Sequence, residues 1–449
     1  MSTQGIEAEL TWTGARFERG VRVTVGADGR IAAVERTGGP GGPPTAGGEG
    51  PSAGRLPGRA LLPGFVDAHS HAFQRGLRGR GESFPEGAGS FWSWREAMYG
   101  LVDALDPERF GALCRTAFEE MRSAGITTVG EFHYLHHADP EAADFRLDEV
   151  LLEAASAAGV RLVLLEAYYA AAGPGRPPEG AQRRFRSPSL EAYWRQMDRL
   201  AGLLDPARQS LGVVAHSLRA ASPDEVAALH GEAVRRGLPF HLHLEEQVRE
   251  IEECRAAYGL RPMEILLDRV EVSPRVTAVH CTHTDAADMA RFGAARGNVC
   301  LCPLTEANLG DGIPDLPGIR ASGAGVCLGT DSNARISMLE EARWAELVQR
   351  LARERRGVAR DEGSGPGAGR VASVLLEAAT AAGARALGVE AGEIRPGARA
   401  DFLAVDLASP ELASSSEETL LESLLLGAGN RSIAATCVGG VWREAPSRS

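Results

Sequence analysis

Eight short apolar runs, each separated from the next by a longer segment, most constrain the fold of this chain. The runs span residues 61–69, 125–134, 161–169, 211–219, 239–246, 276–283, 298–305 and 325–332. Every interval is wide enough for a crossover helix, which parallel strands require. Repeated strand and helix units of this kind predict an α/β fold with a parallel sheet. Because eight such units close a (β/α)8 TIM barrel, we predict a barrel over residues 61–388.

The segment after Leu105 shows the helical half of one unit most clearly. Asp106 can cap a helix, and Pro107 suits its first turn. Apolar residues then recur at helical spacing, at Phe110, Leu113, Ala117, Phe118 and Met121. We therefore expect a crossover helix with one buried stripe.

The two ends of the chain are expected to form a second, small β domain. Residues 8–36 alternate short β-type runs with turns, and Asp28 and Gly29 supply hairpin chemistry. Residues 392–406 and 432–444 show β-type signals again. We predict a β-sandwich-like domain built from residues 1–60 and 389–449. Between its strands, the Gly/Pro-rich residues 38–54 favour an exposed flexible loop.

Composition excludes several classes of protein. With 449 residues, 44% of them hydrophobic, the chain can bury a large core. A formal net charge of -12 gives no basic surplus for nucleic acid or anionic lipid. The N-terminus lacks a signal-peptide pattern, and no stretch approaches the roughly 20 apolar residues of a membrane span. We expect a cytoplasmic enzyme acting on a small molecule, with its seven cysteines reduced.

Histidine and aspartate side chains fall at the ends of the first, fifth and eighth runs. His69 and His71 lie two apart, so both side chains share one face of an extended strand. Taken alone, this pair could also be two surface or core histidines that bind no metal. His243 and Asp331 strengthen the case, since neutral imidazole and carboxylate oxygen both bind zinc. Active sites of such barrels form at the carboxyl ends of the strands, so we predict a zinc site there.

Three further residues could belong to the same site. Glu246 lies three residues beyond His243, near enough to act on a metal-bound water. His280 could be a fourth protein ligand or a hydrogen-bond partner of that water, and we favour the partner. For His241 we favour a packed barrel or supporting position over ligation. Solvated or structural positions are expected for the remaining weaker candidates, His133, His136, His137, His230 and His283.

Motifs along nearly the whole chain resemble the amidohydrolase superfamily, specifically its mononuclear deaminase branch. They are LPGFVDAHSHAFQRG, HLHLEEQ, VHCTHTD, LCPLTEANLGDG and LGTDSN, in this order. A second set is similar to the family of N-formimino-L-glutamate deiminases: HSHAFQRGLRG, SFWSWREAMY, EFHYLHH, AHSLRA and PLTEANLGDGI. One departure is Asn333, where some relatives carry histidine two positions after the aspartate. This difference affects the loop after Asp331 more than the binding of the metal.

The resemblance implies hydrolysis of N-formimino-L-glutamate to N-formyl-L-glutamate and ammonia, with metal-activated water attacking the formimino carbon, in histidine degradation. It implies one zinc per chain, held by His69, His71, His243 and Asp331. Catalytic residues carry over to Glu246, as proton shuttle, and to His280 and Asp331. Substrate contacts carry over to Gln74, Arg95, Tyr134, His216 and Arg219. A homodimer is suggested by the resemblance alone.

Two alternative functions remain open on the residues themselves. A sister deaminase acting on a purine or pyrimidine ring would share the zinc site, and a catalytically inactive barrel would share the fold. Arg95 and Arg219 favour the glutamate-derived substrate, because guanidinium groups offer bidentate donors to carboxylates. Without the resemblance, Arg95 also fits a solvated side chain and Arg219 a loop-anchoring ion pair.

Overall fold

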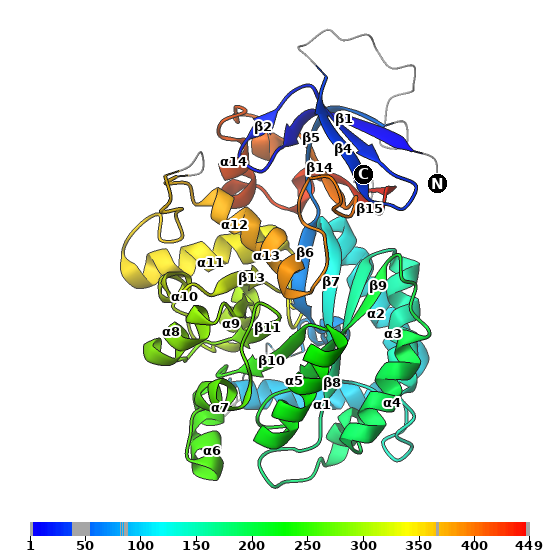
Figure 1. Ribbon diagram of the computed structural model, residues 1–449, viewed down its shortest axis with the longest axis vertical. Helices are drawn as coiled ribbons and strands as arrows, with labels where there is room; N and C mark the ends of the chain where they lie inside the picture. Colours follow the sequence, from blue (N-terminus) through cyan, green and yellow to red (C-terminus); the bar gives the residue numbers. More distant parts are fainter. Residues whose placement is uncertain are drawn as a thin grey trace.

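The computed structural model describes residues 3–37, 54–80, 82, 84, 89–364 and 368–445. It contains two eight-stranded sheets, one forming a barrel and one built from both ends of the chain (Figure 1). The predicted fold class is therefore confirmed. Apart from Gly54, the predicted loop at 38–54 lies outside the described residues. Within the described chain, every helix is too short or too polar to cross a membrane.

The barrel sheet contains eight parallel strands in the order in which they occur along the chain. They are β6 (Phe65–Ser70), β7 (Ile126–His133), β8 (Arg161–Tyr168), β9 (Gln209–Ala215), β10 (Phe240–Leu244), β11 (Val276–His280), β12 (Asn298–Leu301) and β13 (Gly325–Leu328). Each of the eight apolar runs overlaps one of these strands. Most of their residues are buried on both faces, as expected for parallel strands covered by helices.

The end of β6 and the segment after β13 close the barrel. The amide of Asp331 donates to the His69 carbonyl oxygen over 3.0 Å, and the His71 amide donates to the Asp331 carbonyl oxygen over 2.9 Å. Ser70 and Asp331 form the corresponding isolated parallel bridge. The closing hydrogen bonds thus lie among three of the predicted ligands.

Helices cover the outside of the barrel and follow the strands (Figure 1). The helix predicted after Leu105 is α2 (Pro107–Ser123), and the Asp106 carboxylate accepts the Arg109 amide over 2.8 Å. The other helices are α1 (Phe91–Ala104), α3 (Arg146–Ala158), α4 (Leu190–Ala201), α5 (Pro223–Arg236), α6 (Val248–Tyr258), α7 (Pro262–Arg269), α8 (Ala286–Ala294), α9 (Pro303–Leu309), α10 (Leu316–Ser322), α11 (Met338–Arg353), α12 (Ala372–Ala378), α13 (Ala381–Ala386) and α14 (Leu420–Gly427).

The second sheet unites the first and last strands of the chain at one end of the molecule (Figure 1). Its order is β16 (Val441–Glu444), β15 (Ile433–Val438), β14 (Phe402–Asp406), β5 (Arg55–Pro63), β1 (Gln4–Trp12), β3 (Val21–Val25) and β4 (Ile31–Arg36), with β2 (Phe17–Glu18) beside β1. Only Gly64 separates β5 from barrel strand β6. The domain boundaries at residues 60 and 388 stay predictions.

A buried ion pair links the two sheets. Arg161, the first residue of β8, donates from Nε to Asp401 Oδ2 over 2.7 Å and from Nη2 to Oδ1 over 3.0 Å. Their side chains are 4% and 1% exposed. Asp401, just before β14, also accepts the Gly439 amide over 2.7 Å. Removing one partner would leave a buried charge without compensation.

We therefore expect Asp401→Ala to lower the free energy of unfolding by about 3–5 kcal/mol, measured by urea denaturation. Arg115→Ala, which breaks an exposed pair with Glu119, is the control and should cost at most about 1 kcal/mol. The double variant Arg161→Met with Asp401→Leu should be more stable than Asp401→Ala. Equal losses in Asp401→Ala and Arg115→Ala would contradict the expectation.

Candidate metal centre and active site

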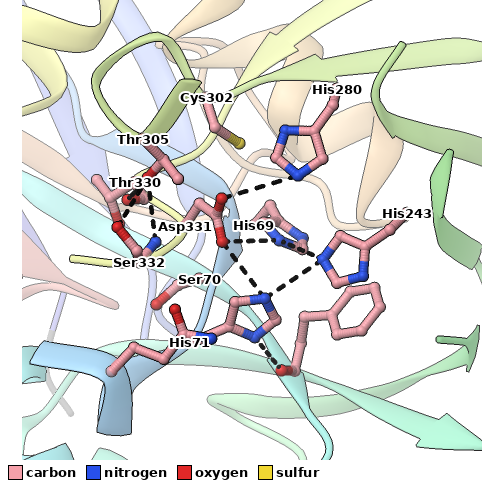
Figure 2. Close-up of polar contacts among 12 residues, drawn as sticks. His69, Ser70, His71, His243, His280, Cys302, Thr305, Thr330, Asp331 and Ser332 are labelled. Carbon is pink, nitrogen blue, oxygen red and sulfur yellow. Dashed lines mark hydrogen bonds and ion pairs between the residues drawn. The ribbon is translucent and has the colours of Figure 1, made fainter. Parts of the chain in front are cut away.

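Four donor side chains converge at the carboxyl end of the barrel (Figure 2). His69 lies near the end of β6, and His71 directly follows that strand. His243 lies in β10, and Asp331 follows β13. One ligand atom from each lies within 4.8 Å of all the others. The Nε2 atoms of His243 and His69 are 3.2 Å apart, and those of His71 and His243 are 3.3 Å apart. Asp331 Oδ1 lies 3.3 Å from His71 Nε2 and 3.5 Å from His69 Nε2.

Hydrogen bonds at the Nδ1 atoms of His71 and His243 determine which way the lone pairs on their Nε2 atoms point. His71 Nδ1 lies 2.7 Å from the Phe132 carbonyl oxygen, and His243 Nδ1 lies 3.1 Å from the His216 carbonyl oxygen. A carbonyl only accepts, so both Nδ1 atoms carry the proton. In the neutral rings each Nε2 then presents a lone pair to the other. A cation between them satisfies both, and carbonyl partners of this kind are usual behind metal-ligating histidines.

The spacing of the donors also fits a metal. A tetrahedral ion with bonds of about 2.0–2.1 Å places its ligand atoms roughly 3.3 Å apart, close to the separations of 3.2–3.5 Å found here. Burial lowers the pKa of His71 to about 3 and holds that of His243 well below its usual range. Neutral imidazole is the form that ligates, so the four residues fit a bound divalent cation.

His280 and Glu246 lie beside the four donors. His280, the last residue of β11, has its Nε2 atom 3.8 Å from both Asp331 Oδ2 and Glu246 Oε1. Its Nδ1 atom lies 3.4 Å from Glu306 Oε1. Burial raises the pKa of Glu246 above its usual value. A carboxyl group with a raised pKa holds a proton more readily, so Glu246 can both accept and donate one.

Left-handed backbone conformations occur where these side chains leave the barrel. Glu245 has φ of 52°, His280 of 73°, Cys281 of 53° and Asp331 of 49°. Non-glycine residues adopt this region rarely, and such strain gathers at functional sites. Glu245 is held by its carboxylate, which accepts the Met263 amide over 3.2 Å. The polar residues are therefore oriented by the backbone at the strand ends or just beyond them.

All five predicted substrate contacts line one pocket together with Glu246, His280 and Asp331. Gln74 donates to the Tyr134 hydroxyl over 2.7 Å. Arg219 places Nη2 3.7 Å from Glu246 Oε2. The Arg95 guanidinium lies over the Trp92 ring, 4.3 Å from its centroid, and its Nε atom is buried without a hydrogen-bond partner among the described residues.

The structure adds residues that sequence reasoning missed. Aromatic side chains form much of the pocket wall, namely Phe91, Trp94, Tyr99, Tyr169 and Phe185. Several lie in the motif SFWSWREAMY, whose density of aromatic residues was the available signal. Glu306, in α9, gave no such signal. His241 lies apart from the donors, with Nε2 3.1 Å from the Ala386 carbonyl oxygen.

Comparison with known proteins identifies the family. The amidohydrolase family model matches residues 60–443. Formimidoylglutamate deiminase of Pseudomonas aeruginosa is 41% identical over 438 residues, covering 95% of this chain and 91% of its own. The 8-oxoguanine deaminase of the same organism is 29% identical, covering 85% of this chain and 82% of its own.

Among solved structures, an amidohydrolase from Brucella melitensis superposes with a TM-score of 0.84 and is 33% identical, covering 98% of this chain and 94% of its own. The resemblance predicted from the motifs is therefore confirmed. A barrel with polar residues converging at its carboxyl end and a family match over most of its length lead to one conclusion: the chain belongs to the amidohydrolase family and is a hydrolase of C–N bonds other than peptide bonds.

Proposed function

We propose that this protein hydrolyses N-formimino-L-glutamate to N-formyl-L-glutamate and ammonia, in histidine degradation, with one zinc ion in the active site. One observation carries the proposal: a single pocket is lined by two arginines, by Glu246 and His280, and by residues of the candidate metal centre. The similarity to formimidoylglutamate deiminase supports the same substrate.

Zinc is proposed because the donor set of three imidazoles and one carboxylate suits it. When bound, zinc lowers the pKa of water from about 15.7 toward roughly 7 and polarises the bond under attack. His69, His71, His243 and Asp331 would hold it. Asp331 would also accept a proton from the attacking water, since its second oxygen, Oδ2, faces His280 at 3.8 Å.

Glu246 is proposed as the proton shuttle. The formimino group is an amidine, and its nitrogen must leave as ammonia because expulsion as an amide anion would be prohibitively costly. Glu246 would bind the amidine and deliver the proton to the departing nitrogen. His280, 3.8 Å from both Glu246 and Asp331, would donate to the oxygen on which charge develops. Water supplies the formyl oxygen, so atoms and charge balance.

Arg95 and Arg219 are proposed to bind the two carboxylates of the glutamate part. The aromatic pocket walls would also suit a flat ring, and the similarity to 8-oxoguanine deaminase makes a ring deaminase the alternative. Two guanidinium groups in one small pocket favour a dicarboxylate. The homodimer stays a prediction.

The direct test is an ammonia assay with the purified protein. We expect ammonia and N-formyl-L-glutamate from N-formimino-L-glutamate, and no turnover of guanine. Formamide as product, or turnover of guanine alone, would exclude the proposed reaction and move the assignment to the alternative. Chromatography of the products distinguishes these outcomes.

Glu246→Gln should retain the active-site zinc and lose about 10²–10⁴-fold in kcat. The amide keeps the shape of the side chain but carries no exchangeable acidic proton. Metal content by elemental analysis and kcat by ammonia release are the two measurements. A variant with full metal content and an unchanged rate would refute the shuttle.

Arg219→Ala should mainly raise KM, by roughly 10- to 150-fold, which corresponds to about 1.5–3 kcal/mol for a charged hydrogen bond. A rise in KM with little change in kcat follows if the arginine binds substrate and transition state equally. Arg249→Ala is the matched control, because Arg249 is an exposed arginine of the neighbouring helix α6 that pairs with Glu253. Equal KM values for both variants would contradict the assignment of Arg219.

A further inference from the structure

A second cluster of metal-ligating side chains lies outside the barrel, between its strands and the covering helices. His133 is the last residue of β7, His136 follows it, Asp148 lies in α3, and Glu166 lies in β8. His133 and Glu166 are register partners on neighbouring strands. The four side chains are between 0% and 1% exposed. The cluster is therefore sealed from solvent and separate from the pocket described above.

The neighbours of His133 in β7 show which face the cluster occupies. Phe132 points inward, with its ring centroid 4.2 Å from that of His243, and Tyr134 lines the active-site pocket. Successive residues of a strand point to opposite faces, so His133 points outward to α3. This places the cluster behind the strand whose Phe132 carbonyl oxygen receives His71 Nδ1 at 2.7 Å.

The donor atoms of the cluster are as close together as those of the first site. Asp148 Oδ1 lies 3.0 Å from His133 Nε2 and 3.0 Å from His136 Nδ1. Glu166 Oε1 lies 3.2 Å from His136 Nδ1. One ligand atom from each residue lies within 4.8 Å of all the others. These separations approach the edge of roughly 3.3 Å expected around a tetrahedral ion.

Two of the atoms that face away from the centre have protein partners. His136 Nε2 lies 2.8 Å from the Ala167 carbonyl oxygen, so this nitrogen carries a proton and Nδ1 points inward. Gln196, in α4, donates from Nε2 to Asp148 Oδ2 over 2.7 Å. Anchors of this type orient metal ligands from behind. They leave His136 Nδ1 and Asp148 Oδ1 directed at the same point.

Glu166 shows that protons alone satisfy the cluster poorly. The side chain is 0% exposed, and neither of its carboxyl oxygens makes a hydrogen bond within the described chain. Oε1 has an ion-pair contact with His136 Nδ1 at 3.2 Å, but the same nitrogen also faces Asp148 Oδ1 at 3.0 Å. A single N–H group serves two carboxylates poorly, whereas a cation between them contacts both.

We propose that His133, His136, Asp148 and Glu166 bind a second divalent cation of the zinc type, in a closed structural site. Two imidazoles and two carboxylates give four ligands, the number typical of structural zinc. Two carboxylate charges balance a dication, so the site is neutral when filled. Filling it gives Glu166 a direct bond to the cation and ends the competition of the two carboxylates for His136 Nδ1. The ion would tie α3 and β8 to the end of β7 and so fix the Phe132 carbonyl behind His71.

The proposal is tested by counting ions. Protein stripped with a chelator is titrated with Zn²⁺, dialysed and analysed for zinc per chain. Two ions per chain are expected for the unaltered protein, one in each cluster. Glu166→Gln should retain one, because a neutral amide replaces a charged ligand at equal size. Asp331→Asn, in the first site, should also retain one, and Glu246→Gln should retain two.

One ion per chain in the unaltered protein, or two in Glu166→Gln, would overturn the proposal. Thermal melting adds an independent measurement, since zinc should raise the Tm of Asp331→Asn but not that of the double variant Asp331→Asn with Glu166→Gln. The unaltered protein alone decides the count if a variant fails to fold. The result is also separate from the proposed function, because ammonia release does not enter the measurement.

Discussion

The backbone pairing between the end of β6 and the segment after β13 is the contact on which the candidate metal centre depends. It joins His69, His71 and Asp331 through their own main chains, so closing the barrel brings three donors together in one step. Gly329 permits this approach, because a Cβ atom there would lie 2.6 Å from the His69 carbonyl oxygen. The position of the donors is thus a property of the sheet, and the covering helices need only keep the sheet closed.

Both ligand clusters are built on the same physical plan. In each, a backbone carbonyl accepts from the outer nitrogen of a histidine, at His71 and His243 in one and at His136 in the other. The inner nitrogen is thereby turned toward the other donor atoms of its cluster. The clusters differ in their surroundings: one opens to a pocket lined by arginine and aromatic side chains, and the other is closed by helices. Access from solvent, rather than the type of ligand, therefore distinguishes a catalytic site from a structural one.

The sequence predicted much of this arrangement because barrel strands are short and their ends carry the polar residues. His69, His71, His243 and Asp331 could be grouped once the eight runs were recognised. The cluster around Asp148 and Glu166 could not be predicted in this way. β8 is buried at every position, so alternation does not distinguish residues that point into the barrel from those that point outward. The contact of His133 and His136 with Asp148 depends further on how α3 packs, which local spacing does not specify.

The place of β5 in the terminal sheet has a consequence for synthesis of the chain. β5 pairs with β1 on one side and with β14 on the other, yet β14 spans Phe402–Asp406, far later in the sequence. On the ribosome one edge of β5 therefore stays unpaired while the whole barrel is being made. An open strand edge is a template for pairing with other chains. Newly made protein is thus open to aggregation through this edge until its last strands emerge, even when all the ligands of the metal centre have already been made.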